Sequence, residues 1–344
     1  MPEGRQEGAG PIRVAIDTMG GDYGPLETVK GALKGLDAHD IELVLVGDPG
    51  LVEAELARHE TPRGSIRVVP SEGKIGDDEH PVEALRRKPK ASIIVGAKLL
   101  KSGDADVLVS MGSTGASVAT AMFVLGLMEG LERPCIGGPF LGVAPNTVLL
   151  DMGSNVDCRP PLLVSFAALG SVFARKFLEI ENPRVGLLSV GAEEAKGNRQ
   201  TQESYQLLKK SHLNFVGNVE GMDFFTGRAD VIVCDGFVGN ILMKFTEGLG
   251  TALSSYIQKR LAASLSPEEL ARVSADLWQT TNLPRTMGGP LFGVNGAMIL
   301  GHGSCQATEI SGAINTAVRY VELGLVESMR EELAELNRNS KAKV

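Results

Sequence analysis

Short apolar runs rich in β-branched residues alternate with helical patterns along most of the chain. The first run covers residues 12–16, and a helical pattern follows over residues 26–36. Further apolar runs occur at residues 41–46, 66–69, 106–109, 147–150, 185–189, 231–234 and 298–300. Strands that alternate with helices indicate right-handed crossovers and a mostly parallel sheet with helices on both faces. We therefore expect an α/β protein with a three-layer α/β/α fold.

Six of the transitions from strand to helix pass through a short, glycine-rich loop. These loops cover Asp17 to Asp22, Ser110 to Gly115, Asp151 to Asn155, Gly191 to Asn198, Asp235 to Asn240 and Gly301 to Cys305. The start of a helix leaves N–H groups unpaired and favours negative charge, and glycine lets the backbone approach an oxyanion closely. On a parallel sheet such loops open at one edge, where α/β proteins bind ligands. The pattern indicates an enzyme that handles phosphate or acyl groups.

One stretch, from Gly248 to Asn282, contains no strand pattern. Apolar residues recur there at helical spacing, namely Leu253, Tyr256, Ile257 and Leu261. The segment Ser266-Pro267-Glu268-Glu269 that follows is typical of a helix start. We expect a helical hairpin inserted into the α/β core. Two interpretations stay open: the hairpin packs in an oligomer or acts as a lid, or its amphipathic helices contact a membrane surface.

The chain of 344 residues is acidic, with 34 Lys and Arg against 42 Asp and Glu and a net charge of −8. This balance argues against nucleic acid as the main partner, but an anionic substrate is compatible with it because individual loops can still be positive. The four cysteines are far apart and lack the spacing of metal ligands, which is typical of free thiols in a reducing cytosol. We expect no metal and no cofactor.

The α/β pattern is expected to form a single catalytic domain over residues 11–335, with polar tails at residues 1–10 and 336–344. The first tail has no apolar core, so it is not a signal peptide. The uncharged stretch from Val107 to Met128 is long enough to suggest a membrane span. Its first half, however, has a strand and turn pattern and its second half is helical with many small residues. We therefore expect a buried strand–loop–helix unit.

Three polar side chains in the loops are candidates for chemistry. Lys196 offers a cation to an oxyanion, and the alternative is an ordinary surface lysine. Asn240 offers a donor and an acceptor, and the alternative is a helix N-cap. His302, between two glycines, can supply a proton near neutral pH, and the alternative is a hydrogen-bonded histidine at a sheet end. The neighbouring Cys305 is better explained as a small buried residue than as a nucleophile.

Several familiar motifs are missing from the sequence: the P-loop, the dinucleotide-binding fingerprint and the nucleophile elbow of hydrolases. The one dense basic cluster consists of Arg86, Arg87 and Lys88. It is open to three interpretations, which are a solvated helix end, an anion clamp and a docking patch for an acidic carrier.

Taken in order, the loops resemble the PlsX family of bacterial phosphate acyltransferases. The matching segments run from Ala15 to Ser304 and are AIDTMGGDYGP, ALRRKPKAS, SMGSTGA, LLDMGSNVDCRP, EEAKGN, DGFVGN and HGS. The resemblance implies a fold similar to that of phosphotransacetylases and isocitrate-type dehydrogenases. It also implies transfer of a fatty acyl group from an acyl-carrier-protein thioester to inorganic phosphate, at the start of phospholipid synthesis.

The resemblance further implies a cytoplasmic homodimer whose hairpin associates reversibly with the membrane, and a membrane glycerol-3-phosphate acyltransferase that uses the acyl phosphate. With this resemblance we predict Lys196, Asn240 and His302 as catalytic residues. Arg86, Arg87 and Lys88 are predicted to dock the acyl carrier protein. Phosphate and substrate contacts are predicted for Asp17, Gly20, Gly21, Gly112, Ser113, Thr114, Gly115, Gly153, Ser154, Asn155, Asn198 and Ser304.

Two features depart from the family pattern. The basic residues of the hairpin are offset by acidic ones, which weakens the case for electrostatic attraction to anionic lipid. Cys305 stands where a serine is expected in relatives, which argues against an essential thiol. Two other functions stay open: another enzyme on the same architecture, such as a short-chain phosphotransacetylase that uses coenzyme A or a dehydrogenase, and a non-catalytic scaffold for membrane lipid enzymes.

Overall fold

The computed structural model describes residues 10–60, 66–142 and 144–341. Contacts between Cα atoms divide the chain into two compact units, of which the first consists of Met1–Ile136 with Arg285–Val344 and the second of Gly137–Pro284. The N-terminal tail expected over residues 1–10 lies outside the described residues except for Gly10. Residues 342–344 of the expected C-terminal tail also lie outside them.

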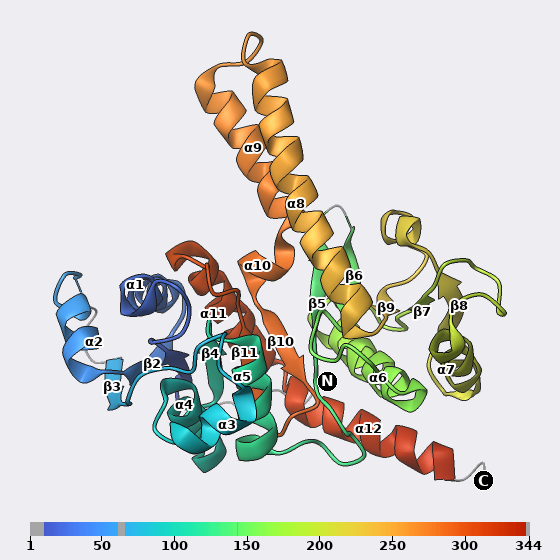
Figure 1. Cartoon of the computed structure of the whole chain (residues 1–344), viewed down its shortest axis with the longest axis horizontal. Helices are drawn as coiled ribbons and strands as arrows, with labels where there is room; N and C mark the ends of the chain where they lie inside the picture. The colour runs from blue at the N-terminus through green and yellow to red at the C-terminus, as the bar shows by residue number, and fades with distance from the viewer. Residues whose placement is uncertain (1–9, 61–65, 143, 342–344) are drawn as a thin grey trace. The chain divides into compact units, whose positions relative to one another are not determined.

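The first unit is built on a mostly parallel sheet (Figure 1). In spatial order its strands are β3 (Ile66–Pro70), β2 (Ile41–Gly47), β1 (Ile12–Asp17), β4 (Val107–Ser110), β11 (Ala297–Leu300) and β10 (Gly289–Phe292). The strand β10 is antiparallel to β11 and to the first two residues of β5 (Cys135–Leu141), and the other pairs are parallel. Asp17, Ser110 and Leu300 are register partners across β1, β4 and β11. The glycine-rich loops after these strands therefore begin at one edge, as predicted.

Helices cover both faces of this sheet. Ala15, Val44 and Leu108 pack in a buried cluster with α4 (Ser92–Ser102). Side chains alternate along a strand, so the buried strand residues next to Ala15, Val44 and Leu108 face the opposite side of the sheet. On that side α1 (Gly24–Ala38) and α11 (Ala307–Glu322) contact the strands. The remaining helices are α2 (Pro49–Leu56), α3 (Pro81–Arg87), α5 (Thr114–Thr120), a π-helical turn (Ala121–Leu125), α10 (Leu283–Met287) at the unit boundary and α12 (Leu325–Lys341).

The uncharged stretch from Val107 to Met128 folds as expected into a strand, a loop and a helix. It contains β4, α5 and the π-helical turn, and most of its side chains are buried or half-buried. Within the described ranges, no helix combines the length and the apolar character needed to cross a bilayer. At the C-terminus, α12 continues to Lys341 and Leu336 is buried, so residues 336–341 belong to a helix.

The second unit carries the strands β5, β6 (Ala144–Leu150), β9 (Val231–Val233), β7 (Val185–Leu188) and β8 (Phe215–Val219) in that spatial order. The pair β5 and β6 is antiparallel, and the others are parallel. Val233 is the register partner of both Leu150 and Leu187, so the loops after β6, β9 and β7 begin at one edge. The helix α6 (Pro160–Phe177) packs on β6 and β9, α7 (Arg199–Lys210) packs on β7 and β8, and a short 3₁₀ helix (Gly221–Phe225) follows β8.

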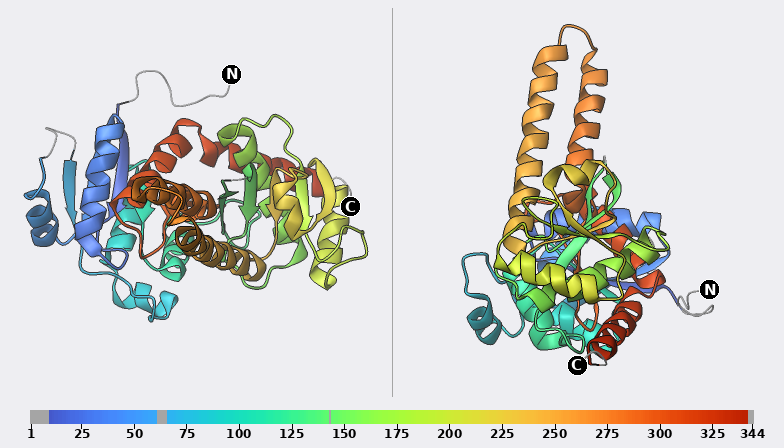
Figure 2. Two further views of the ribbon diagram at one scale, coloured as in Figure 1. Left: turned by 90° about the horizontal axis from the view of Figure 1, so that it is seen from above. Right: turned by 90° about the vertical axis from the view of Figure 1, so that its right-hand side faces the viewer.

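The helical hairpin belongs to the second unit and consists of α8 (Gly236–Leu261) and α9 (Pro267–Thr281), which lie side by side (Figure 2). The hairpin predicted over residues 248–282 is confirmed, but α8 begins earlier, directly after β9. It begins there because Asp235 caps it: Asp235 Oδ1 accepts the Val238 N–H at 2.8 Å.

Local signals in the sequence also explain the turn and the pairing of the hairpin. Ser266 and Glu269 form a reciprocal capping box at the start of α9, as the sequence predicted. Gly250 lets the helices approach closely, since a Cβ there would lie 2.0 Å from the Thr281 Oγ1. A hydrogen bond from the Ser254 hydroxyl to the Ser274 carbonyl joins the two helices further out.

Candidate active site

Hydrogen bonds around Asp17 tie two of the predicted loops together in the first unit. The buried Asp17 carboxylate accepts the Gly20 N–H at 3.1 Å and the Ser110 hydroxyl at 2.7 Å. The Ser110 Oγ in turn accepts the Gly112 N–H at 3.1 Å. The loop after β1 and the loop after β4 therefore share one network at the sheet edge.

The loop after β11 joins this edge through the backbone. The Asp22 N–H donates to the Gly303 carbonyl at 2.8 Å. Gly21 has a φ of +79°, and a Cβ there would lie 2.9 Å from the same carbonyl oxygen. Glycine at this position therefore permits both the backbone conformation and the close approach of the two loops. Gly21, predicted to contact phosphate, lies where the two loops meet.

Burial dominates the electrostatics of Asp17. It raises the pKa of this carboxyl above its ordinary value, and the Ser92 and Ser110 hydroxyls and the Gly20 N–H oppose the rise because they stabilise the charged form. The Ser92 hydroxyl lies beside this carboxylate, and its Oγ has no hydrogen-bond partner within the described residues.

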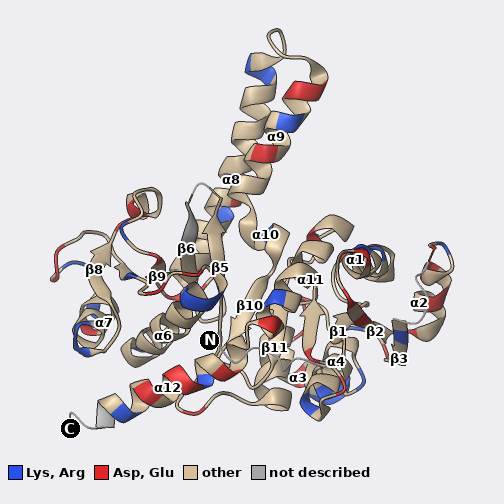
Figure 3. Ribbon diagram, turned by 180° about the vertical axis from the view of Figure 1, so that it is seen from behind, with Lys and Arg blue, Asp and Glu red and all other residues tan. Residues whose placement is uncertain are grey.

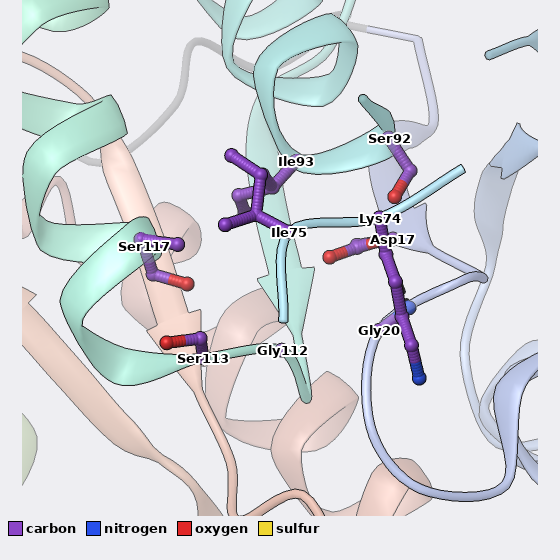
Figure 4. A pocket seen from close by; sticks show the side chains of 10 residues that line it. Asp17, Gly20, Lys74, Ile75, Ser92, Ile93, Gly112, Ser113 and Ser117 are labelled. Carbon is purple, nitrogen blue, oxygen red and sulfur yellow. Dashed lines mark hydrogen bonds between the residues drawn. The ribbon is translucent and has the colours of Figure 1, made fainter. Parts of the chain in front are cut away.

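A hollow that opens to solvent lies beside Asp17 (Figure 4). Its lining contains four residues predicted as phosphate or substrate contacts, namely Asp17, Gly20, Gly112 and Ser113. It also contains polar residues that were not predicted as site residues, namely Lys74, Ser92 and Ser117. The sequence carries only weak signals for these three, because they lie in a charged loop, at the start of α4 and one turn into α5.

Ser113, Thr114 and Gly115 lie where the loop after β4 becomes α5. Ser113 occupies the N-cap position without a capping hydrogen bond from its side chain. Thr114 and Gly115 are exposed residues of the first helical turn. Of the three, only Ser113 belongs to the lining of the hollow.

His302 and Ser304, both predicted as site residues, are in direct contact on the loop after β11. The His302 Nδ1 lies 2.8 Å from the Ser304 Oγ and accepts the Ser304 N–H at 3.2 Å. With Nδ1 as the acceptor, the neutral ring carries its hydrogen on Nε2, from which it can donate a hydrogen bond. The Arg285 guanidinium donates to the Ser304 carbonyl at 2.9 Å and so holds this loop in place.

In the second unit, the loop after β6 closes on Asp151. The buried carboxylate accepts the N–H groups of Gly153 at 3.1 Å, Ser154 at 2.8 Å and Asn155 at 2.8 Å, together with the Asn155 side-chain amide at 2.8 Å. Burial raises the pKa of Asp151, and these donors oppose the rise. Three residues predicted to contact phosphate therefore direct their backbone N–H groups toward Asp151.

Asn240 lies in the second turn of α8 with an exposed side chain, against the Asp151 loop. A Cβ on Gly153 would lie 3.3 Å from both the Cβ and the Oδ1 of Asn240. The N-cap of α8 is Asp235, so the alternative interpretation of Asn240 as a helix cap does not hold. The structure thus brings Gly153 and Asn240 together.

Lys196 and Asn198 lie on the loop between β7 and α7, and both side chains are exposed. Asn198 is the N-cap of α7, where its Oδ1 accepts the Thr201 N–H at 2.9 Å. The Lys196 side chain passes over Gly191, where a Cβ would lie 2.9 Å from the Lys196 Cγ. Glycine at residue 191 therefore leaves room for the lysine.

The basic cluster is divided by the structure. Arg86 and Arg87 are exposed in the last turn of α3. Lys88 is half-buried, and its Nζ pairs with Glu79 at 2.5 Å and donates to the Lys74 carbonyl at 3.1 Å. The Gly76 N–H and the Lys88 ammonium lower the pKa of Glu79. Lys88 therefore has a structural role beside the hollow, whereas the two arginines face solvent.

The four cysteines are buried thiols. Burial raises the pKa of Cys158 to about 12, and it raises the pKa of Cys234 well above the ordinary value. Cys305 donates weakly to the Arg285 carbonyl at a distance of 3.8 Å. Among the described residues, no group of three or more His, Cys, Asp or Glu side chains is arranged to hold a metal ion.

Comparison with known proteins places these loops in one family. A family model described as "Fatty acid synthesis protein" matches residues 12–328. Relatives named phosphate acyltransferase include proteins from Desulforamulus reducens, 42% identical over 94% of this chain and 97% of the relative, and from Clostridioides difficile, 37% identical over 96% and 98%. A third, from Desulfitobacterium hafniense, is 42% identical over 94% of this chain and 98% of its own.

Solved structures with a similar fold include two phosphotransacetylases. The one from Streptococcus pyogenes has a TM-score of 0.58 and 17% identity, over 91% of this chain and 94% of its own. The one from Staphylococcus aureus has a TM-score of 0.55 and 16% identity, over 90% and 94%. These matches confirm the fold that the sequence predicted.

Proposed function

Because the chain belongs to the fatty acid synthesis protein family, whose curated relatives are named phosphate acyltransferase, it is an acyltransferase, and we propose that it makes acyl phosphate from a fatty acyl thioester of acyl carrier protein. Inorganic phosphate is the acceptor, and the product enters phospholipid synthesis through a membrane glycerol-3-phosphate acyltransferase. The observation that carries this proposal is the loop network around Asp17, which borders a hollow with Lys74 and several serine hydroxyls suited to phosphate.

In the proposed reaction a phosphate oxygen attacks the thioester carbonyl carbon. The new C–O bond forms, the C–S bond breaks, and the proton of the phosphate moves to the departing thiolate. Phosphate is itself the nucleophile, so the enzyme has to orient the reactants and stabilise charge. The buried state of the cysteines supports direct attack, because a nucleophilic cysteine requires an accessible thiolate.

We assign the predicted catalytic residues to separate tasks. Lys196 and Asn240, whose side chains are exposed, stabilise the oxyanion that develops on the carbonyl oxygen. His302 donates a hydrogen bond from Nε2 to the departing thiolate, a role supported by the hydrogen bond that the Ser304 N–H makes to Nδ1. Gly153, together with Ser154 and Asn155 in the same closed loop, acts through its packing against Asn240.

Arg86 and Arg87 dock the acidic carrier protein in this proposal. Both guanidinium groups are exposed at the end of α3, where they can meet an acidic surface from solvent. Lys88 contributes indirectly, because its ion pair with Glu79 holds the end of the helix.

The hairpin serves a homodimer and a weak membrane contact. Exposed apolar residues follow one row of α8 at a spacing of four residues, namely Phe237, Ile241, Phe245, Leu249 and Leu253. The leucines near the tip, Leu261 and Leu265, are half-buried, and both signs of charge occur at the outer end (Figure 3). Such a row supports packing against a second copy, with a membrane contact that depends little on salt.

The double variant Phe245→Glu with Leu249→Glu tests this role, because it places two charges in the apolar row. We expect the protein to change from dimer to monomer in analytical ultracentrifugation and to leave sedimented vesicles. Val273→Glu on α9 is the matched control, since Val273 is exposed outside the row. A double variant that stays dimeric and vesicle-bound would contradict the proposal.

Mass-spectrometric detection of the product tests the function directly. Purified protein with inorganic phosphate and a long-chain acyl-carrier-protein thioester should yield acyl phosphate. A short-chain phosphotransacetylase would instead prefer coenzyme A thioesters, and a non-catalytic scaffold would yield no product from either donor. Preference for the coenzyme A donor, or no acyl phosphate at all, would reject the proposed function.

A further inference from the structure

We propose that the hollow beside Asp17 is the binding site for free inorganic phosphate, in which Lys74, Ser92 and Ser117 donate to the ion and Asp17 accepts the hydroxyl group of the phosphate. This inference rests on the proposed function for the identity of the ion. It adds three binding residues and a basis for selecting phosphate over other anions.

Two buried hydroxyls carry the inference. Ser92 and Ser117 are 0% and 1% exposed, and within the described residues neither Oγ has a hydrogen-bond partner, although the Ser92 hydroxyl lies beside the Asp17 carboxylate. They come from different helices, α4 and α5, yet both line the same hollow (Figure 4). A buried hydroxyl without a partner is destabilising, so two of them at one hollow indicate that a bound molecule completes their hydrogen bonds.

Lys74 supplies positive charge at the same place. Its Nζ donates to the Gly21 carbonyl at 2.6 Å, which uses one of the three donors of the ammonium group. The Lys74 carbonyl accepts from Lys88, so the backbone of this lysine is also held. The lining also includes the apolar residues Ile75, Ile93 and Ala116 beside the exposed Lys74 side chain. A lysine beside the serines favours an anion over a cation as the ligand.

Asp17 makes the site selective. A carboxylate repels an anion that is fully ionised, but it can accept a hydrogen bond from an anion that carries a hydroxyl group. Inorganic phosphate keeps at least one P–O–H group at neutral pH, whereas sulfate and the phosphodiester of a carrier's prosthetic group keep none. The hollow should therefore prefer free phosphate to both. The acyl phosphate dianion also lacks this hydroxyl, so Asp17 favours the substrate over the product.

The test measures binding of inorganic phosphate to the full-length protein by equilibrium dialysis, without an acyl donor. Ser92→Ala and Ser117→Ala should each weaken binding roughly 10- to 100-fold, the size expected for a hydrogen bond to a charged group. Ser71→Ala is the matched control, because Ser71 is also buried and its Oγ also has no partner in the part of the chain that the structure describes, but it lies outside the lining. Unchanged phosphate binding in both serine variants would overturn the proposal.

Selectivity gives an independent measurement on the unmodified protein. An excess of sulfate should leave phosphate binding to the wild type intact. The Asp17→Asn variant should bind phosphate and sulfate with more similar affinities. If sulfate displaces bound phosphate from the wild type as readily as added phosphate does, Asp17 does not select phosphate over other anions. Kinetics separates this inference from the proposed function. If both serine variants form acyl phosphate with a normal KM for phosphate, the inference is wrong and the proposed function stands. Serine-dependent phosphate binding without any acyl phosphate formation defeats the function alone.

Discussion

The loop after β1 and the loop after β6 both start with a buried aspartate at a strand end and continue through glycine, but the two carboxylates have different partners. Within the described residues, the Asp151 carboxylate accepts the N–H groups of Gly153, Ser154 and Asn155 and the Asn155 side-chain amide, all from its own loop. Asp17 accepts from Gly20 in its own loop and from Ser110 on the neighbouring strand.

The Asp151 loop is a closed turn, in which the carboxylate accepts the N–H groups of its own loop, whereas the Asp17 loop is an open turn, which leaves donors available beside it. In the Asp151 loop the carboxylate takes up the N–H groups that an anion would need, so the loop stabilises itself and supports Asn240. In the Asp17 loop the carboxylate bridges two strands, and two hydroxyls at the hollow beside it have no partner within the described residues. A glycine-rich turn at the end of a strand is therefore an anion site only when its donors are not already used by its own side chains.

The largest expected effect breaks the closed turn. Asp151→Ala leaves three backbone N–H groups and the Asn155 amide without their acceptor, so the free energy of unfolding should fall by about 3 kcal/mol or more. Asp17→Ala should cost less, roughly 1–3 kcal/mol, because fewer donors lose a partner and the Ser110 hydroxyl can rotate. Urea unfolding midpoints measure both. Equal losses would show that the two loops are alike after all.

A second effect tests what the closed turn supports. Lys196→Ala and Asn240→Ala should each lower turnover by ~10²–10³ with little change in the unfolding midpoint, since both side chains are exposed. Gly153→Ala should also lower turnover, because the new methyl group presses on Asn240. Gly227→Ala is its control, because Gly227 also has a positive φ, of +67°, and among the described residues a Cβ there meets nothing within 4 Å. Normal turnover in the Lys196 and Asn240 variants would remove both from catalysis.

A third effect concerns the helix next to the open turn. Arg86→Glu with Arg87→Glu should raise the KM for the acyl carrier protein roughly tenfold and flatten its salt dependence, because oppositely charged surfaces then repel. Lys88→Ala should leave the salt dependence as it is, since Lys88 pairs within the chain. If the phosphate KM rises while the carrier KM stays constant, the arginines bind phosphate and the docking role is excluded.

The smallest effect is on pH dependence. Burial raises the pKa of Asp17, so the folded protein holds this proton more tightly than the unfolded chain. Its contribution to stability is therefore present at low pH and is lost as the pH rises from about 3.9 through the pKa of the folded state. Asp17→Asn does not titrate, so its stability should fall less over that range. Thermal melting at a series of pH values measures this, and parallel curves for the two proteins would contradict it.

The sequence by itself determined the alternation of strands and helices, the common edge at which the loops begin, and the hairpin. Each of these follows from local physics: the spacing of apolar residues, the conformational freedom of glycine, and the cap at Ser266. The family motifs could also be read directly, because they are short runs of neighbouring residues.

Only the tertiary structure decided which polar groups are used up and which remain available. Asp17 and Ser110 are 93 residues apart in the chain, and no local pattern indicates their hydrogen bond. The same holds for the hollow, which collects Lys74, Ser92 and Ser117 from a loop and two helices. Whether a donor faces a ligand or a carboxylate of its own fold depends on packing between distant segments, which periodicity and local motifs do not specify.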